Sequence, residues 1–273
     1  MKQSMKIAGG IALGALALAA GLYVSALRVP GEPLLKKCWA ADLIDRATGE
    51  KIVGAEDMDF DPVTGTIFIS AYDRRAVAHE IAAGKVTVQG GIYALNVADL
   101  TNAAALPVSD LTHDLKRGQP FLPHGFALQR KENGAGLYVI NRVYAPQTKE
   151  KLHLVAFIEA LDWNGSSLLR AHSLYSTDLC HPNDLAPYAE GFLITNDRAA
   201  CGVGAALWEA LTETNTGFIM AFGGSAFSKA VEGLAFPNGI ALAADGEEWI
   251  AALTRGKSLA RFRKDGSNWR LAE

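Results

Sequence analysis

Short apolar segments separated by Gly-containing turns recur along most of this chain. They occur as pairs, one apolar segment following another across a turn, that begin near residues 56, 124, 183 and 238. Short runs rich in apolar and β-branched residues and bounded by turn residues are typical of β-strands. Helical periodicity is weak after residue 30, where the stretch 205–212 is the best helix candidate. The pattern therefore predicts an all-β chain.

The four pairs form an internal repeat, and each begins with a polar side chain: Glu56, His124, Asn183 and Asn238. The intervals between them can each hold a four-stranded blade and a loop, and further apolar segments at 91–95, 154–157, 217–222 and 259–262 fill them. Because the innermost strands of a β-propeller line a central channel, we expect the four side chains to form a ring at one mouth of that channel. The alternative is that they are ordinary turn residues.

An apolar, uncharged run at residues 7–27 follows Lys2 and Lys6 near the amino terminus. It reaches the length of about 20 residues that spans a bilayer as a helix, yet residues 24–26 also resemble a small-residue cleavage site. Either an uncleaved anchor or a cleaved signal peptide leaves the rest exported, because the positive flank stays inside. We therefore expect a periplasmic or extracellular protein that is free or anchored to the membrane. The expected domains are 1–27 as signal peptide or anchor, 28–37 as linker and 38–273 as the propeller.

Composition excludes several function classes. The formal net charge of −3 and the lack of a long basic block give no footprint for nucleic-acid binding. The three cysteines, Cys38, Cys180 and Cys201, show no CxxC spacing, so a cysteine zinc site is not expected, and an odd number leaves one thiol over if a disulfide forms. The chain has no Gly-x-Ser-x-Gly elbow and no GxGxxG loop.

Four segments carry a resemblance to a known family: GAEDMDFDPVTGTIFIS, PHGFAL, PNDLAPYAEGFLITND and TGFIMAFGGSAFSKAVEGLAFPNGIALAADGEEWIAAL. In order and approximate spacing they resemble the paraoxonase/arylesterase family of six-bladed β-propellers, which is related more distantly to gluconolactonase-type proteins. The resemblance covers roughly residues 34–270. About four blades of the expected six are visible, so we expect an incomplete propeller preceded by an apolar helix.

The resemblance implies two calcium ions in the central tunnel. Glu56, Asn183 and Asn238 match the ligands of a catalytic ion, whereas Asp57, Asp184 and the backbone carbonyl of Phe126 match those of a structural ion. Calcium takes about 6–8 oxygen ligands from carboxylates, amides, backbone carbonyls and water, which are the groups these residues offer. Zinc would favour clustered His and Cys.

The resemblance also assigns catalytic roles. His124 matches the catalytic histidine, which would activate a water molecule, and Asp197 resembles an acidic position close to the active site. Calcium would polarise the substrate carbonyl. Two departures stand out: the segment 138–142 lacks the family's second histidine, and two further calcium ligands would lie beyond residue 273.

The expected function is a calcium-dependent hydrolase of lactones or aryl esters, acting on a small molecule. Two alternatives stay open. One is a non-catalytic propeller that calcium stabilises, which the missing histidine and ligands favour. The other is a sugar-lactone hydrolase of the gluconolactonase type.

Overall fold

The computed structural model describes residues 39–101, 103–116, 120–131, 134–148, 151–201, 208–209, 211–212, 214–244, 246–266 and 268–272. By its internal contacts the chain divides into residues 1–40 and 41–273, and the second unit holds the sheets. The apolar run 7–27 and the linker 28–37 lie outside the described residues. Within the described part of the chain, no helix is long and apolar enough to cross a membrane.

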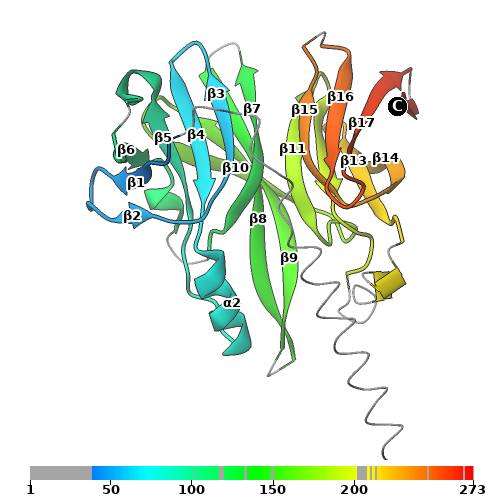
Figure 1. Ribbon diagram of the computed structural model, residues 1–273, viewed down its shortest axis with the longest axis horizontal. Helices are drawn as coiled ribbons and strands as arrows, with labels where there is room; N and C mark the ends of the chain where they lie inside the picture. Colours follow the sequence, from blue (N-terminus) through cyan, green and yellow to red (C-terminus); the bar gives the residue numbers. More distant parts are fainter. Residues whose placement is uncertain are drawn as a thin grey trace, which may run out of the picture. The chain divides into compact units, whose positions relative to one another are not determined.

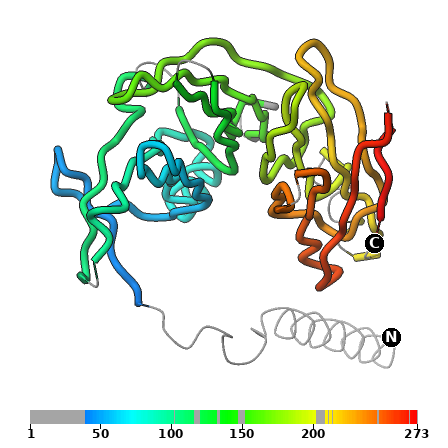
Figure 2. Tube along the Cα trace, turned by 90° about the horizontal axis from the view of Figure 1, so that it is seen from above, coloured from blue at the N-terminus to red at the C-terminus, as the bar shows by residue number. Residues whose placement is uncertain are grey.

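Four sheets succeed one another in chain order (Figures 1 and 2). Sheet 1 has the strand order β2-β1-β6-β5-β4-β3 and contains β1 (Asp42–Asp45), β2 (Lys51–Ile52), β3 (Ala55–Asp61), β4 (Thr66–Ala71), β5 (Gly91–Asn96) and β6 (Ala105–Asp110). Its β1 pairs parallel with β6. Sheet 2 is an antiparallel meander of β7 (Pro123–Lys131), β8 (Gly134–Thr148), β9 (Lys151–Trp163) and β10 (Leu168–Tyr175).

Sheets 3 and 4 are antiparallel meanders of the same kind. Sheet 3 contains β11 (Pro182–Tyr188), β12 (Gly191–Asn196), β13 (Gly217–Phe222) and β14 (Phe227–Leu234). Sheet 4 contains β15 (Pro237–Leu242), β16 (Glu248–Leu253), β17 (Ser258–Asp265) and β18 (Asn268–Leu271). Consecutive four-stranded meanders whose first strands adjoin are the arrangement of propeller blades. The predicted all-β, propeller-type fold is confirmed.

The hydrophobic core lies between successive sheets. One cluster joins sheets 2 and 3 through residues such as Ile140, Ile158 and Phe192, and another joins sheets 3 and 4 through Ile219 and Trp249. The strands β12 and β13 are buried along their whole length, because sheet 3 packs on both faces. This explains why their sequences are continuous apolar runs instead of alternating ones.

A helix that the sequence analysis did not predict, α2 (Arg74–Ala82), comes after β4. Asp73 caps its amino terminus, accepting hydrogen bonds from the backbone N–H groups of Arg75 at 3.0 Å and Ala76 at 2.9 Å. Its apolar side packs Val77 into a cluster with Tyr72 and Leu122. Of the predicted helix at 205–212, residues 208, 209, 211 and 212 are helical and the others lie outside the described residues.

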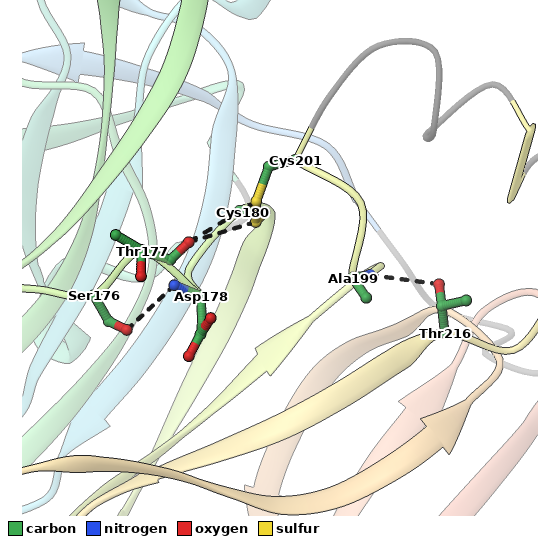
Figure 3. Close-up of a disulfide and its surroundings, with 7 residues drawn as sticks. All are labelled: Ser176, Thr177, Asp178, Cys180, Ala199, Cys201 and Thr216. Atoms are coloured by element: carbon green, nitrogen blue, oxygen red, sulfur yellow. Dashed lines mark hydrogen bonds between the residues drawn. A yellow bond between two sulfur atoms is a disulfide. The ribbon is translucent and has the colours of Figure 1, made fainter.

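Cys180 and Cys201 form a disulfide (Figure 3). Their Cα atoms lie 4.8 Å apart, within the usual range of about 4.4–6.8 Å. The bond joins the residues just before β11 to the segment after β12. The segment before β11 and the segment after β12 are thereby held together. Cys38 lies outside the described residues.

Candidate metal and active site

The first strands of the four sheets, β3, β7, β11 and β15, contact one another in chain order. Each is irregular at the same point of its pairing with the second strand, between Ala55 and Asp57, Pro123 and Phe126, Pro182 and Leu185, and Pro237 and Ile240. A β-bulge of this kind redirects the side chain that it leaves unpaired. The four polar side chains of the sequence repeat, Glu56, His124, Asn183 and Asn238, all lie within these irregular segments.

The bulges surround a polar cavity of about 200 Å³ at the end of the sheets where the four first strands begin, here called the mouth. The cavity is lined by Glu56, Asp57, Gly125, Asn183, Asp184, Asn238 and Gly239. Five of the six residues that the sequence analysis expects to bind calcium therefore meet there. The sixth, Phe126, lines a second cavity of about 490 Å³ beyond Asp57 and Asp184, and neither His124 nor Asp197 lines the polar cavity.

Gly125 explains how the strands approach so closely at the mouth. A Cβ atom at this position would lie 2.2 Å from the backbone oxygen of Asn183 and 2.5 Å from the Cα atom of Asp184. No side chain fits there, so β7 and β11 come together only because residue 125 is glycine. The glycine thus brings Asn183 and Asp184 against the bulge that carries His124.

Asp57 and Asp184 join neighbouring first strands. Asp57 Oδ2 accepts a hydrogen bond from the backbone N–H of Phe126 at 2.9 Å, and Asp184 Oδ2 accepts one from Ile240 at 2.8 Å. The two carboxyl groups also hydrogen-bond each other. Burial raises the pKa of Asp57, and burial together with the nearby Asp57 charge raises the pKa of Asp184 well above its ordinary value. Two close carboxyl groups of raised pKa retain a proton or bind a cation.

Glu56 lies between two basic side chains. Its Oε2 is 2.5 Å from Nη1 of Arg74 on α2, and its Oε1 is 3.2 Å from Nε2 of His124. Burial raises the pKa of Glu56, an effect that Arg74 and Arg142 partly offset. His124 is 2% exposed, and burial, together with the charges of Arg142 and Arg74, lowers its pKa to about 2. His124 is therefore a neutral imidazole at ordinary pH, and its Nδ1 is buried with no hydrogen-bond partner.

Asp197 lies directly after β12, and its backbone N–H donates to the carbonyl of His181 at 3.0 Å. Its carboxyl group accepts a hydrogen bond from the side chain of Asn183, which places it beside one of the cavity residues. Burial raises the pKa of Asp197 to about 6, partly offset by Arg142 and Arg198. Its Oδ1 is buried without a hydrogen-bond partner. The carboxyl group can consequently gain or lose a proton near neutral pH.

Sequence reasoning missed the arginines of the mouth. Arg142 lies in β8, in the segment where a second histidine was expected, and its charge acts on Glu56, His124 and Asp197. Arg74 begins the unpredicted helix α2. The Asp73 cap could have indicated that helix, but neither arginine carries a local sequence signal for the site.

The donor chemistry of the cavity fits calcium. Carboxylate and amide oxygens line it, and no sulfur or imidazole does. Within the described residues there is no group of three or more His, Cys, Asp or Glu side chains close enough to hold a metal, so a site here needs the amide oxygens of Asn183 and Asn238. The buried Asp57 and Asp184, with their raised pKa values, are the acidic pair that a divalent cation would neutralise.

No protein-family model and no curated protein sequence matches this chain. Among solved structures, it is similar to a periplasmic gluconolactonase from Pseudomonas aeruginosa, at 13% identity and a TM-score of 0.48, over 84% of this chain and 61% of that one. It is also similar to a gluconolactonase from Xanthomonas campestris, at 11% identity and a TM-score of 0.47, over 82% of this chain and 59% of that one. A third similar structure is regucalcin from Agrobacterium tumefaciens, described as a calcium-binding protein, at 16% identity and a TM-score of 0.43, over 85% of this chain and 64% of that one. The chain spans about three fifths of the length of these proteins.

Proposed function

We propose that this protein is a calcium-dependent hydrolase of lactones or related esters, with its active site at the mouth. One observation carries the proposal: four bulges at the same point of four first strands bring the oxygens of Glu56, Asp57, Asn183, Asp184 and Asn238 to one cavity. Residues far apart in sequence meet there, and their donor atoms are those that calcium prefers.

The chain's own residues would divide the task between two ions. Glu56, Asn183 and Asn238 would hold a catalytic ion, while Asp57, Asp184 and the carbonyl of Phe126 would hold a structural one. When bound, calcium supplies polarisation of the substrate carbonyl and stabilises negative charge on its oxygen. Gly125, by having no side chain, lets β7 and β11 approach closely enough to bring these ligands together.

Position and pKa together bear on the choice of general base: neither His124 nor Asp197 lines the cavity, but Asp197 accepts a hydrogen bond from the cavity residue Asn183. A base works best when its pKa lies near the operating pH. The pKa of His124 is lowered to about 2 by burial and two arginines, whereas burial raises that of Asp197 to about 6. We therefore assign to Asp197 the role of accepting the proton from the attacking water. Neutral His124 would instead position Glu56 through Nε2.

A second candidate function is a calcium-stabilised propeller without catalysis. The ion pair between Glu56 and Arg74 favours it, because the carboxylate of Glu56 already has a cationic partner within the chain. In this alternative, calcium would bind through Asp57 and Asp184 alone. Heat stability would then respond to calcium although no ester is cleaved.

The test uses the purified full chain with phenyl acetate, γ-butyrolactone, glucono-δ-lactone and an N-acyl-homoserine lactone. Excess EGTA should abolish hydrolysis and lower Tm, and calcium added back should restore both. Glu232→Gln, an exposed change remote from the cavity, is the matched control variant. Hydrolysis that persists in excess EGTA would overturn the proposal. A calcium-dependent Tm with no hydrolysis of any substrate would favour the scaffold, and the preferred substrate separates arylesterase from sugar lactonase.

The domain boundaries and the export of the chain, both expected from residues 1–37, stay predictions. Fractionation of cells that express the full chain tests the export and the membrane anchoring. Export requires the protein outside the cytoplasm, and anchoring requires it in the membrane fraction. A protein found in the cytoplasm alone would contradict both export and anchoring.

A further inference from the structure

Three arginines reach the mouth from three different sheets. Arg74 lies at the start of α2 after sheet 1, Arg142 lies in β8 of sheet 2, and Arg198 lies just after β12 of sheet 3. In Figure 1, α2 and the long ends of β8 and β9 project at the same end of the sheets. The proposed hydrolase chemistry uses none of these three cations.

Arg142 differs from Arg74 in its partners. Arg74 is paired with Glu56, but Arg142 donates from Nη2 to the backbone carbonyl of Pro182 at 2.6 Å. In the part of the chain that the structure describes, no carboxylate lies within ion-pair distance of Arg142, and its Nε is buried without a hydrogen-bond partner. Arg142 is half-buried, and its charge acts on Glu56 in the polar cavity. A guanidinium in such a place with an unused donor is the kind of group that binds an anion.

The uncharged groups around Arg142 also favour an anionic ligand. The charge of Arg142 acts on Tyr72, Tyr144 and His181 as well as on the cavity residues. Burial raises the pKa of both tyrosines, so they keep their hydroxyl protons. This wall of the mouth therefore offers the positive charges of Arg142 and Arg74 and two tyrosine hydroxyls, with the carboxylate of Glu56 also close to Tyr72. A carboxylate or phosphate is the complementary ligand.

We propose that the substrate carries an anionic group, a carboxylate or a phosphate, which Arg142 binds while the reacting carbonyl lies at the cavity. The identity of the reaction rests on the proposed function, whereas the binding of the anion does not. Arg142 is held in place for this role by its hydrogen bond to Pro182, the residue directly before Asn183. A planar guanidinium anchored by one nitrogen keeps its other donors in a fixed orientation.

The kinetic test compares two lactones with the same ring, one neutral and one anionic: γ-butyrolactone, and 5-oxotetrahydrofuran-2-carboxylate, which carries a carboxylate on that ring. We expect wild type to prefer the anionic lactone in kcat/KM. Arg142→Gln should reduce that preference by about 10- to 100-fold, the usual range for a lost hydrogen bond to a charged group, and Arg142→Lys should restore part of it. The control is Arg263→Gln, an exposed arginine on β17 opposite Glu248, which should leave the preference unchanged.

A binding measurement separates this inference from the proposed reaction. Tetrahydrofuran-2-carboxylate has the ring and the anion but no lactone carbonyl, and isothermal titration calorimetry measures its binding without turnover. Binding to wild type that weakens with added salt and is lost in Arg142→Gln supports the inference, even if no lactone is hydrolysed. Equal hydrolysis of both lactones, or equal binding by wild type and Arg142→Gln, would overturn it and leave the hydrolase proposal standing.

Discussion

The two ends of the first strands differ in how their buried polar side chains are partnered. At the far end of β3, Asp59 Oδ2 accepts a hydrogen bond from the backbone of Leu128 at 3.0 Å. Asp61, which is fully buried, binds the guanidinium of Arg130 and accepts from Val63 N–H at 3.1 Å. At the mouth, by contrast, His124, Asp197 and Arg142 each keep a buried polar atom without a partner.

This difference separates structure from function within one set of strands. Buried polar groups in native proteins are nearly always hydrogen-bonded, so satisfied carboxylates at the far end act as joints between sheets 1 and 2. The unpartnered atoms of His124, Asp197 and Arg142 gather at the mouth, where a ligand, an ion or an ordered water would supply the partner. The contrast leads to four predictions, in order of decreasing effect.

Glu56→Gln should have the largest effect, on activity and not on folding. Because even residues that only support metal ligands cost about 10–100-fold in activity, loss of a proposed direct ligand should lower kcat/KM by about 100-fold or more. Calcium affinity should fall together with it, while Tm measured without calcium stays close to wild type. Retention of most of the wild-type activity would remove Glu56 from the site.

Asp61→Asn should have the opposite profile at the other end of the same strand. It removes a charge-assisted hydrogen bond to Arg130, and such bonds contribute about 1.5–3 kcal/mol. We expect the free energy of unfolding to fall by about 2 kcal/mol, with kcat/KM of the folded protein within about threefold of wild type. Asp162→Asn breaks an exposed pair with Lys131 and should cost less than about 1 kcal/mol.

The pH dependence of kcat/KM should report the proton on Asp197. Burial raises its pKa to about 6, so the carboxylate form that serves as base is lost as the pH falls below that value. The expected profile drops about tenfold per pH unit on the acid side, and Asp197→Asn should remove this limb. If His124 were the base instead, its pKa of about 2 would leave the rate flat down to the pH at which the protein unfolds.

Ser70→Ala should have the smallest effect. The Ser70 hydroxyl is fully buried and donates to the backbone carbonyl of His124 at 2.6 Å, linking β4 to the bulge of β7. Its removal should cost about 1–2 kcal/mol of stability, measured by urea unfolding, because a buried carbonyl loses its donor. Ser228→Ala, at an exposed position of β14, is the control, and an equal loss there would contradict the role of Ser70.

Local sequence pattern predicted the strands and the polar residues at their starts. Strands such as β4, β12 and β13 are short apolar runs bounded by turn residues, and the polar first residues repeat at matching positions. The helix α2 was missed because its apolar positions are few, with Val77 its one buried residue. The cap at Asp73 and the glycine at position 84, which has a positive φ of 77°, are the local signals that mark its ends.

Other features depend on contacts between distant segments, which no local pattern encodes. Three cysteines allow three pairings, so the bond between Cys180 and Cys201 required the fold. Arg142 reaches the mouth because β8 continues beyond Asn141, the residue opposite Pro123. The lowered pKa of His124 likewise results from burial and two arginines that come from other elements.

A crystal structure of the full chain grown with calcium would locate the ion through its anomalous signal. We expect a peak in the polar cavity, within about 2.3–2.6 Å of oxygens from Glu56, Asn183 and Asn238. In that structure Arg74 should have moved away from Glu56, because the carboxylate would then bind the ion. An empty cavity with the pair between Arg74 and Glu56 intact would contradict the proposed metal site and the hydrolase chemistry that depends on it.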